Sequence, residues 1–276
     1  SRYAESIGSV REAIEVGAAG LEVETARAQI GSMPSGAARN ALDCALWDLE
    51  AKLETTPAWA LAELAREPRP VRTMRTVSVA SPDEMRNAAR SLTGADVIKV
   101  KVDGGADLER IAAVHEGAPN AKLVVDPNEG WSIEQTTAWL PKLESLGVVV
   151  LEQPLPAERD EALDAITERA VPICADESFH DRRSFTHVLG RYDMINLKLD
   201  KSGGLTEALL CAQEAQRAGM PIMVGCMVST ALAIEPALLL AVDARYVDLD
   251  GPLLLESDRE GALYDRDAGI LRPSPS

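Results

Sequence analysis

The feature that most constrains the fold is a charged residue that recurs at the end of successive short apolar runs. Lys101, Asp126, Glu152, Asp176 and Lys198 follow one another at intervals of 25, 26, 24 and 22 residues. Each interval is about the length of one strand, one helix and their connections. We therefore predict that these five residues occupy equivalent places in successive β-α units.

Short apolar runs alternate with helical patterns through most of the chain. The predicted strands are residues 75–79, 97–102, 122–125, 148–151, 171–175, 194–197, 222–224 and 246–247. The predicted helices between them are residues 82–92, 108–116, 133–146, 161–168, 183–189, 205–218 and 231–241. Strands that alternate with helices imply parallel β-α units, and eight strands imply a closed α/β barrel.

Two other segments flank the predicted barrel, which we place at residues 71–250. Residues 1–70 are rich in alanine, and one apolar helix face recurs at Leu42, Leu46, Leu49 and Leu53. Prolines around Pro70 interrupt this pattern and mark a linker. Residues 251–276 have no repeat pattern, and we expect them to return to the first segment.

Composition excludes several classes of protein. The 276 residues carry 28 Lys and Arg against 44 Asp and Glu, and this net charge of −16 argues against a nucleic-acid partner. The four cysteines lie far apart and the three histidines form no metal-binding pair, so we expect neither disulfides nor a zinc site. The longest apolar stretch, residues 218–242, contains two prolines and a glutamate, which argues against a membrane span. We expect a cytoplasmic protein.

Three of the recurring residues are carboxylates that would meet at one end of the barrel. The carboxyl ends of the strands form the active-site face of such barrels, and charges gathered there are costly unless they bind something or one another. Asp126, Glu152 and Asp176, without a histidine or thiolate, favour a hard cation: Mg²⁺ first, Mn²⁺ second. Asn128 could bond to a ligand or to the substrate. Glu177 competes as a ligand, but strand alternation should point it elsewhere.

Lysines flank these carboxylates. Lys99 and Lys101 share one strand face, and Lys198 comes from the opposite side of the ring. A lysine beside another cation and a divalent metal has a lowered pKa and can then act as acid and base. Two such lysines could remove the proton α to a carboxylate on one face and return one on the other. Lys201 competes with Lys198, but we expect it in the loop beyond the strand.

Two further carboxylates, Asp248 and Asp250, follow the last predicted strand and should lie on one side by alternation. They could bind a second metal, although a cationic substrate group such as an ammonium is the simpler partner. A polar turn ahead of Gly251 is the competing interpretation. The pair Gly203 and Gly204 opens a helix and could bind an anion, a signal too weak to carry a prediction.

These motifs resemble the muconate-lactonizing subgroup of the enolase superfamily. The matching motifs, in chain order, are Lys99-Val-Lys101, Asp126-Pro-Asn128, Glu152-Gln-Pro154, Ala175-Asp-Glu-Ser178 and Asn196-Leu-Lys198 with Ser202-Gly-Gly204. The resemblance implies a modified TIM-type (β/α)7β barrel with an α+β capping domain. In that family the domain begins with a small antiparallel sheet and carries a mobile loop over the active site. Here we expect the chain to begin at the helices of that domain, without the sheet.

The resemblance also assigns roles to the site residues. It makes Lys101 and Lys198 the acid/base pair, and it gives one Mg²⁺ per subunit the ligands Asp126, Glu152 and Asp176. Lys99 is expected to contact the substrate carboxylate and to lower the pKa of Lys101. Asn128, Asp248 and Asp250 complete the expected substrate-binding set.

The run Asp248-Leu-Asp250 is similar to that of the dipeptide epimerases, in which the pair holds the substrate's α-ammonium. Residues 35–49 and 199–208 resemble the bacterial L-Ala-D/L-Glu epimerases. The implied reaction is a Mg²⁺-dependent 1,1-proton transfer through an enediolate, with L-Ala-D/L-Glu as the small-molecule substrate. A role in recycling cell-wall peptides and a homo-oligomeric state are further expectations.

Two rival functions stay open. One is another reaction of the subgroup, namely N-acylamino acid racemase, o-succinylbenzoate synthase or cycloisomerase. Asp248 and Asp250 argue against it, because a substrate without an ammonium has no use for two carboxylates there. The other is a metal-binding barrel without turnover, against which the presence of both lysines argues. Since we expect the chain to begin after the family's mobile loop over the active site, glutamate specificity rests on similarity elsewhere.

Overall fold

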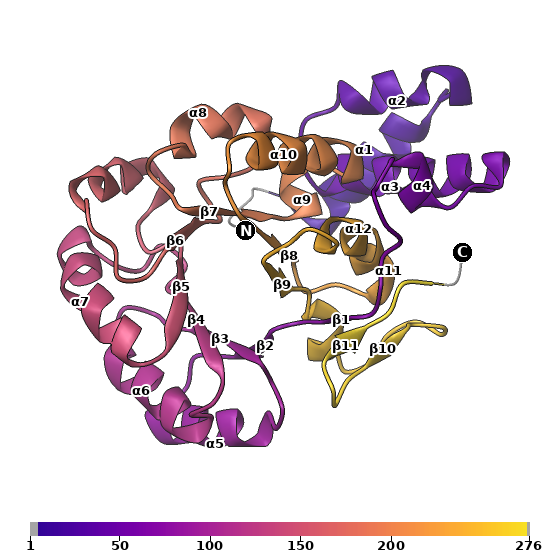
Figure 1. The fold of residues 1–276 in the computed structure, drawn as a ribbon. Helices are drawn as coiled ribbons and strands as arrows, with labels where there is room; N and C mark the ends of the chain where they lie inside the picture. Colours follow the sequence, from indigo (N-terminus) through magenta and orange to yellow (C-terminus); the bar gives the residue numbers. More distant parts are fainter. Residues whose placement is uncertain (1–4, 275–276) are drawn as a thin grey trace.

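The computed structural model describes residues 5–274 and contains an eight-stranded parallel sheet in the order β2-β3-β4-β5-β6-β7-β8-β9 (Figure 1). These strands are β2 (Arg75–Val77), β3 (Val97–Lys101), β4 (Lys122–Asp126), β5 (Val148–Glu152), β6 (Ile173–Ala175), β7 (Met194–Leu197), β8 (Ile222–Gly225) and β9 (Tyr246–Asp248). The first and last strands meet where Met74 donates its N–H to the carbonyl of Val247 at 2.8 Å. The α/β barrel predicted from the alternating pattern is therefore confirmed.

Seven helical connections join the eight strands and form the outer layer (Figure 1). They are α5 (Pro82–Ser91), α6 (Asp107–Gly117), α7 (Ile133–Ser145), the 3₁₀ helix η1 (Ala157–Ala165), η2 (Arg182–Ser184) with α8 (Phe185–Val188), α9 (Leu199–Ser202) with α10 (Leu205–Arg217), and α11 (Ala231–Ile234) with η3 (Glu235–Ala237) and α12 (Leu238–Ala241). This order, seven β-α units and a final strand, is the predicted (β/α)7β arrangement.

Two predicted helices differ from those observed. The helix expected at residues 161–168 is instead η1, in which the backbone leaves helical geometry at Arg159 (φ −135°). The helix expected at residues 231–241 is divided into three short pieces around Pro236, because proline cannot donate a hydrogen bond to the preceding turn. At the helix ends, the side chain of Ser81 accepts the N–H of Glu84 and caps α5, and Gly147 and Gly219 have the positive φ that suits a C-terminal cap.

Inside the barrel, a layer of apolar side chains lies below a layer of carboxylates. Alternate strand residues point inward, and one inward-facing cluster consists of Met74, Val124, Val150, Cys174, Met194 and Met223. The residues two positions further along β4, β5 and β6 are Asp126, Glu152 and Asp176. The period of two therefore places the predicted carboxylates in one layer, directly above an apolar floor.

The remaining elements lie outside the barrel sheet. Among residues 5–70, four helices precede it: α1 (Ile7–Ala18), α2 (Val23–Gly31), α3 (Ala37–Glu54) and α4 (Ala58–Leu61). Helix α3 packs against α9 and α10, which follow β7, and the other three helices pack against α3. After the 3₁₀ helix η4 (Gly251–Leu254), the chain forms β10 (Tyr264–Asp265) and β11 (Ile270–Leu271), and β11 pairs antiparallel with both β10 and β1 (Val71–Arg72). Strand β11 of the C-terminal segment thus pairs with β1, the strand that directly follows the predicted N-terminal segment (residues 1–70).

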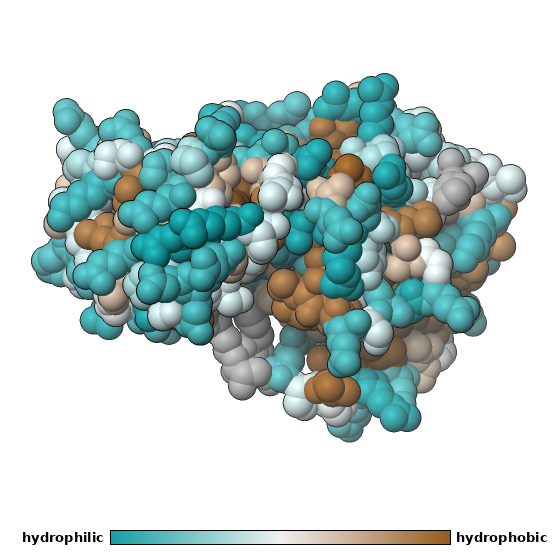
Figure 2. All heavy atoms as spheres, turned by 90° about the horizontal axis from the view of Figure 1, so that it is seen from below, coloured by the Kyte–Doolittle hydropathy of each residue, from teal (hydrophilic) through white to brown (hydrophobic). Residues whose placement is uncertain are grey.

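Polar side chains cover much of the face seen in Figure 2, and apolar ones gather in patches on one part of it. Within residues 5–274, no helix combines the length and the apolar character needed to cross a bilayer.

Two leucines with opposite environments test the packing of the outer helices. Leu143 of α7 has no exposed surface, whereas Leu53 of α3 is 63% exposed. We predict that Leu143→Ala lowers the free energy of unfolding by about 2–5 kcal/mol, because it removes buried methyl groups and leaves a cavity. Leu53→Ala should change it by less than about 0.5 kcal/mol. Urea denaturation followed by circular dichroism measures both, and equal losses would contradict this packing.

Candidate functional site

The predicted carboxylates converge on Lys99 at the carboxyl ends of the strands. The Nζ of Lys99 lies 3.1 Å from Oδ2 of Asp126, 2.8 Å from Oε2 of Glu152 and 2.7 Å from Oδ2 of Asp248. Burial opposes the charged form of Lys99, but the surrounding carboxylates outweigh it and hold its pKa well above the usual value. The lysine expected to meet a substrate carboxylate thus contacts carboxylates of its own chain.

The two proposed acid/base lysines reach the site from opposite strands of the ring. Lys101 closes β3, and its Nζ lies 2.5 Å from Oδ2 of Asp126 and 2.9 Å from Oδ1 of Asn128. Lys198 follows β7, and its Nζ lies 2.6 Å from Oδ2 of Asp176. The side chain of Lys101 is 30% exposed, against 7% for Lys198, so Lys101 is the more accessible of the two.

For Lys198, a lowered pKa was expected beside another cation and a bound divalent metal ion. Among the residues of the chain itself, the balance of charges is different. Burial and Lys99 do lower the pKa, but the carboxylates of Asp176 and Glu152 outweigh both, and the pKa lies above the usual value. The reason is distance, since Asp176 is in direct contact with the ammonium group.

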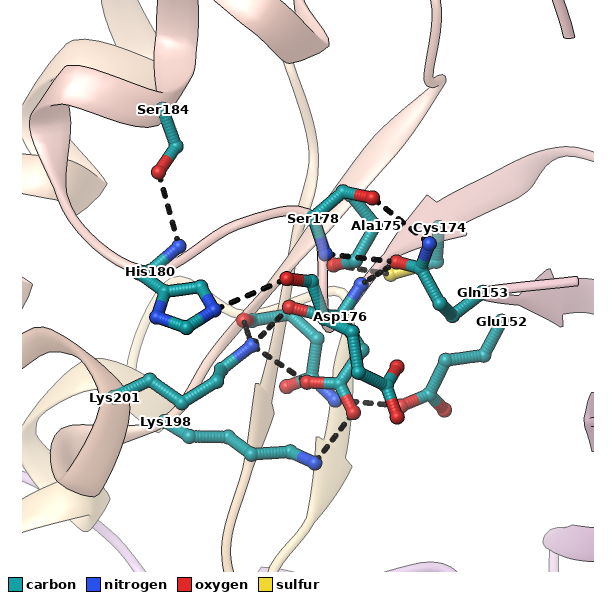
Figure 3. A network of polar contacts seen from close by, with 12 residues as sticks. Glu152, Gln153, Cys174, Ala175, Asp176, Ser178, His180, Ser184, Lys198 and Lys201 are labelled. Atoms are coloured by element: carbon teal, nitrogen blue, oxygen red, sulfur yellow. Dashed lines mark hydrogen bonds and ion pairs between the residues drawn. The ribbon is translucent and has the colours of Figure 1, made fainter. Parts of the chain in front are cut away.

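Asp176 is held by two lysines, one on each carboxylate oxygen (Figure 3). Lys201 donates to Oδ1 and to the carbonyl oxygen of Asp176, both at 2.5 Å, and to the carbonyl of Asn196 at 3.2 Å. The sequence interpretation placed Lys201 in an outer loop, which is wrong: it lies in α9 and is buried. The short helix α9 turns its side chain back toward the barrel. Lys198 and Lys201 hold the pKa of Asp176 well below its usual range, against the effect of burial.

Glu152 is oriented by Asn196, a residue that sequence reasoning did not single out. The Nδ2 of Asn196 donates to Oε1 of Glu152 at 2.9 Å. Burial, followed by the charge of Asp126, raises the pKa of Glu152 to about 7. Asn196 requires space, and Gly225 on the next strand provides it: a Cβ there would lie 2.5 Å from Oδ1 of Asn196. Asn196 stands two residues before Lys198, so strand alternation could have identified it.

Gln153 connects the loops that carry Glu152 and Asp176 (Figure 3). Its Oε1 accepts the backbone N–H groups of Asp176 and Ser178 at 2.9 and 3.0 Å. Its Nε2 donates to the hydroxyl of Ser178 at 2.8 Å and to that of Tyr192 at 3.0 Å. Gln153 has a φ of 35°, which is unfavourable for a residue other than glycine. The side-chain bonds of Gln153 stabilise this strained conformation.

Glu177 requires a second correction. Alternation predicted that it points away from the site, but the chain turns after β6 and Glu177 is buried beside Asn128. The Nδ2 of Asn128 donates to Oε1 of Glu177 at 3.3 Å. Burial, then the charges of Asp176 and Asp126, raise its pKa above the usual value. Asn128 thus connects Lys101 on one side with Glu177 on the other.

Asp248 is the last residue of β9, and Asp250 lies just beyond it as the residue before η4. Oδ2 of Asp248 contacts Lys99, while its Oδ1 is buried without a hydrogen-bond partner in the described part of the chain. Oδ2 of Asp250 accepts the N–H of Thr76 at 2.9 Å. Burial and the charge of Asp248 raise the pKa of Asp250 to about 6, which Thr76 and Lys99 oppose. Asp248 thus pairs with the ammonium of Lys99, whereas Asp250 is bound by a neutral backbone N–H.

The donor set fits a hard cation. Asp126, Glu152 and Asp176 offer only carboxylate oxygens, from three neighbouring strands, in a buried layer. Across residues 5–274, no three His, Cys, Asp or Glu side chains are arranged to hold a metal ion directly. Instead the ammonium of Lys99 lies between Asp126 and Glu152, which shows that these oxygens attract a cation. A divalent ion there would compete with Lys99 for the same oxygens.

Comparison with known proteins identifies the family. A model described as Enolase C-terminal domain-like matches residues 83–267. The L-Ala-D/L-Glu epimerase of Escherichia coli strain K12 is 46% identical over 267 residues, which cover 95% of this chain and 82% of that protein. This chain belongs to the enolase superfamily. The N-acetyl-D-glutamate racemase of a Pseudoalteromonas species is 44% identical, over 84% of this chain and 72% of that protein.

Solved structures of the superfamily have the same fold. An enolase family member from Agrobacterium tumefaciens with homology to dipeptide epimerases, with bound sodium and L-Ala-L-Glu, superimposes with a TM-score of 0.92. It is 42% identical, and the match covers 99% of this chain and 83% of that one. A dipeptide epimerase from Enterococcus faecalis V583, complexed with Mg and L-Leu-L-Tyr, has a TM-score of 0.90 at 28% identity, over 98% of this chain and 81% of that one.

These relatives confirm the resemblance to the enolase superfamily and its dipeptide epimerases. The prediction that the chain is an isomerase is confirmed as well, because the named relatives are epimerases and racemases. The roles of individual residues stay predictions.

Two lysines with equally close carboxylate partners test the buried network. Lys201 lies 2.5 Å from Asp176 and its side chain is 1% exposed, while Lys52 lies 2.5 Å from Asp48 and is 71% exposed. We predict that Lys201→Met lowers the free energy of unfolding by roughly 3 kcal/mol, because Asp176 loses a buried counter-charge. Lys52→Met should leave it almost unchanged, since water screens the exposed pair. Urea denaturation at pH 7 compares them, and two equally small losses would refute the importance of this contact.

Proposed function

We propose that the protein epimerises dipeptides at the carbon next to the free carboxylate, with L-Ala-D/L-Glu as the expected substrate. The observation that carries the proposal is the approach of Lys101 and Lys198 from opposite strands, with a layer of carboxylates between them. Its relatives support the choice of substrate, since one is named an L-Ala-D/L-Glu epimerase and another is complexed with L-Ala-L-Glu.

The reaction follows from two lysines on opposite faces of one carbon. A neutral lysine on one face accepts the α-proton, and the ammonium of the other lysine donates a proton to the opposite face. One proton leaves and another arrives, so the product differs from the substrate only in configuration. In the reverse direction the two lysines exchange roles. Substrate held between two fixed groups needs little reorganisation for either transfer.

A magnesium ion is part of the proposal. Asp126, Glu152 and Asp176 would hold it, one ion per subunit, with manganese as the alternative. When bound, such an ion would neutralise charge that develops on the substrate carboxylate and would offset the carboxylates that raise the pKa of Lys198. Lys99, which now contacts two of these carboxylates, would then be available to the substrate carboxylate. Asn128 keeps Lys101 oriented through the 2.9 Å bond to its oxygen.

The substrate ammonium would bind at Asp248 and Asp250. A buried carboxylate oxygen without a partner is costly, and Oδ1 of Asp248 is such an oxygen among the described residues. A cationic donor of the ligand would satisfy it and would also offset the crowding that raises the pKa of Asp250.

A second candidate is racemisation of an N-acylated amino acid. The relative named N-acetyl-D-glutamate racemase, 44% identical, favours it. An N-acetyl group carries no charge, so this substrate would leave the two carboxylates without a cation. The dipeptide is therefore the better match, and the ammonium site distinguishes the two substrates.

Exchange of the α-proton in heavy water tests the proposed roles of the lysines. We predict that Lys101→Met and Lys198→Met each reduce interconversion of L-Ala-L-Glu and L-Ala-D-Glu by at least about 10²-fold, since each removes one proton carrier. Each variant should still exchange the α-proton of one epimer, a different one in each case, because the remaining lysine faces it. Mass spectrometry of each epimer measures the exchange. Full interconversion by either variant would refute the roles, and Lys52→Met is the control.

Acid pH tests the ammonium site. Since the pKa of Asp250 is raised to about 6, its carboxyl group becomes neutral as the pH falls below 6 and loses attraction for the ammonium. We predict that kcat/KM for the dipeptide decreases below pH 6, by up to about tenfold per pH unit. In Asp250→Asn, kcat/KM for the dipeptide should be low at every pH and should not decrease further below pH 6. With N-acetyl-glutamate as the substrate, neither the wild type nor Asp250→Asn should show the decrease below pH 6. If the pH profile of kcat/KM for the dipeptide were the same in Asp250→Asn as in the wild type, the assignment of Asp250 to the ammonium site would be contradicted. Asp48→Asn, at a side chain that is 65% exposed, is the control.

The same proposal includes the wider context. It divides the chain into a helical part of a capping domain (1–70), the barrel with the site (71–250) and the C-terminal segment (251–276). It also places the enzyme in the cytoplasm, in recycling of cell-wall peptides, as a homo-oligomer.

A further inference from the structure

One face of α3 carries polar residues that the proposed reaction does not use. Asn40, Asp43 and Trp47 recur at steps of three and four residues and so share this face. Asn40 and Asp43 are buried, although they lie in a helix outside the barrel. The face packs against α9 and α10, the two helices that follow Lys198.

Most of these residues meet at Thr206, near the start of α10. Oδ2 of Asp43 accepts the N–H of Thr206 at 2.9 Å, and Oδ1 accepts its hydroxyl at 2.6 Å. The same hydroxyl accepts hydrogen bonds from Trp47 Nε1 at 2.9 Å and from Arg27 Nη1 at 2.8 Å. Asn40 donates to Oδ1 of Asp200 in α9 at 3.1 Å. The start of α10, considered for an external anion, is thus capped by a carboxylate of α3.

The backbone between α9 and α10 touches α3. Gly203 (φ 80°) and Gly204 (φ 120°) form the turn, in conformations that other residues rarely adopt. A Cβ on Gly204 would lie 2.5 Å from Cβ of Asp43, and one on Gly203 would lie 3.0 Å from Cα of Ser35. The turn therefore has little freedom to shift relative to α3.

Lys198 depends on this turn more than Lys101 depends on any helix. Lys101 is the last residue of β3 and pairs in register with Asp126 of β4. Lys198 lies one residue beyond β7, and its carbonyl accepts the N–H groups of Lys201 and Ser202 at 3.0 Å each. It is thus the first residue of the α9 turn, and any displacement of α9 moves it.

We infer that Asn40, Asp43 and Trp47, acting through Asp200 and Thr206, are positioning residues for Lys198 and not for Lys101. The inference rests on the proposed function. A misplacement of about 1 Å can reduce a proton transfer about 10²-fold. Loosening the contact at Thr206 should therefore slow the transfer that uses Lys198 and leave the one that uses Lys101 intact. The N-terminal helices would then set the rate on one face of the substrate only.

Thr206→Val is the test, because it removes the shared hydroxyl and keeps the shape of the side chain. The readout is the initial rate of α-proton exchange in heavy water, measured separately for L-Ala-L-Glu and L-Ala-D-Glu. The epimer whose exchange is lost in Lys198→Met should exchange about 10- to 100-fold more slowly in Thr206→Val. The other epimer should exchange within twofold of wild type. Thr206→Ser, which keeps the hydroxyl, should restore both rates.

Thr136→Val is the matched control: Thr136 lies in α7, its side chain is buried, and its hydroxyl donates to the carbonyl of Ser132, the residue that caps α7. Thr136→Val should not slow the exchange of one epimer more than that of the other.

Trp47→Phe is a second test, which stays valid if Thr206→Val folds poorly. It removes a single hydrogen bond to Thr206, so it should slow the exchange of the same epimer, but by a smaller factor. If Thr206→Val slowed the exchange of both epimers equally, or of neither, the inference about Lys198 would be overturned while the proposed function would stand. A wild-type protein that exchanges neither epimer would overturn the proposed function as well.

Discussion

Carboxylates buried inside the barrel need counter-charges, and this requirement determines the structure of the site. Lys99 lies among three of them, and Lys198 and Lys201 share Asp176. An apolar core of the same size would be easier to fold, so an arrangement of this kind makes sense where the charges serve chemistry. The ion pairs also raise the pKa values of Lys99 and Lys198, so an acid/base role for Lys198 requires a cation or substrate to take over some of the carboxylate charge.

The geometry of the strands places the charged residues of the site close together, and further hydrogen bonds fix the orientation of their side chains. The period of two along each strand puts an apolar layer below and a charged layer above. Asn196 then orients Glu152, and Gln153 bonds to the backbone on which Asp176 lies. Outside the barrel, Asp43 of α3 accepts the N–H of Thr206 near the start of α10, in the β-α unit that follows Lys198. This contact is one of those inferred above to position Lys198.

Sequence reasoning predicted the barrel and the convergence of the site residues because both follow from periodicity. The strand period and the repeat of about 25 residues are local patterns, and they also fix which side of the barrel each strand-end residue faces. Positions two or more residues beyond a strand end could not be predicted in this way. Glu177 and Lys201 were placed wrongly because the chain turns after β6 and β7, where alternation no longer applies. The high pKa of Lys198 depends on a distance to Asp176 that no sequence pattern contains.

The central claim is that the carboxylate layer binds a divalent cation and is more than a set of internal ion pairs. Titration calorimetry of the purified protein with Mg²⁺ tests it most directly, with Glu152→Gln and Glu177→Gln compared with wild type. We predict one Mg²⁺ per chain in the wild type and in Glu177→Gln, and no binding in Glu152→Gln. An absence of Mg²⁺ binding in the wild type, or binding that survives in Glu152→Gln, would contradict the account.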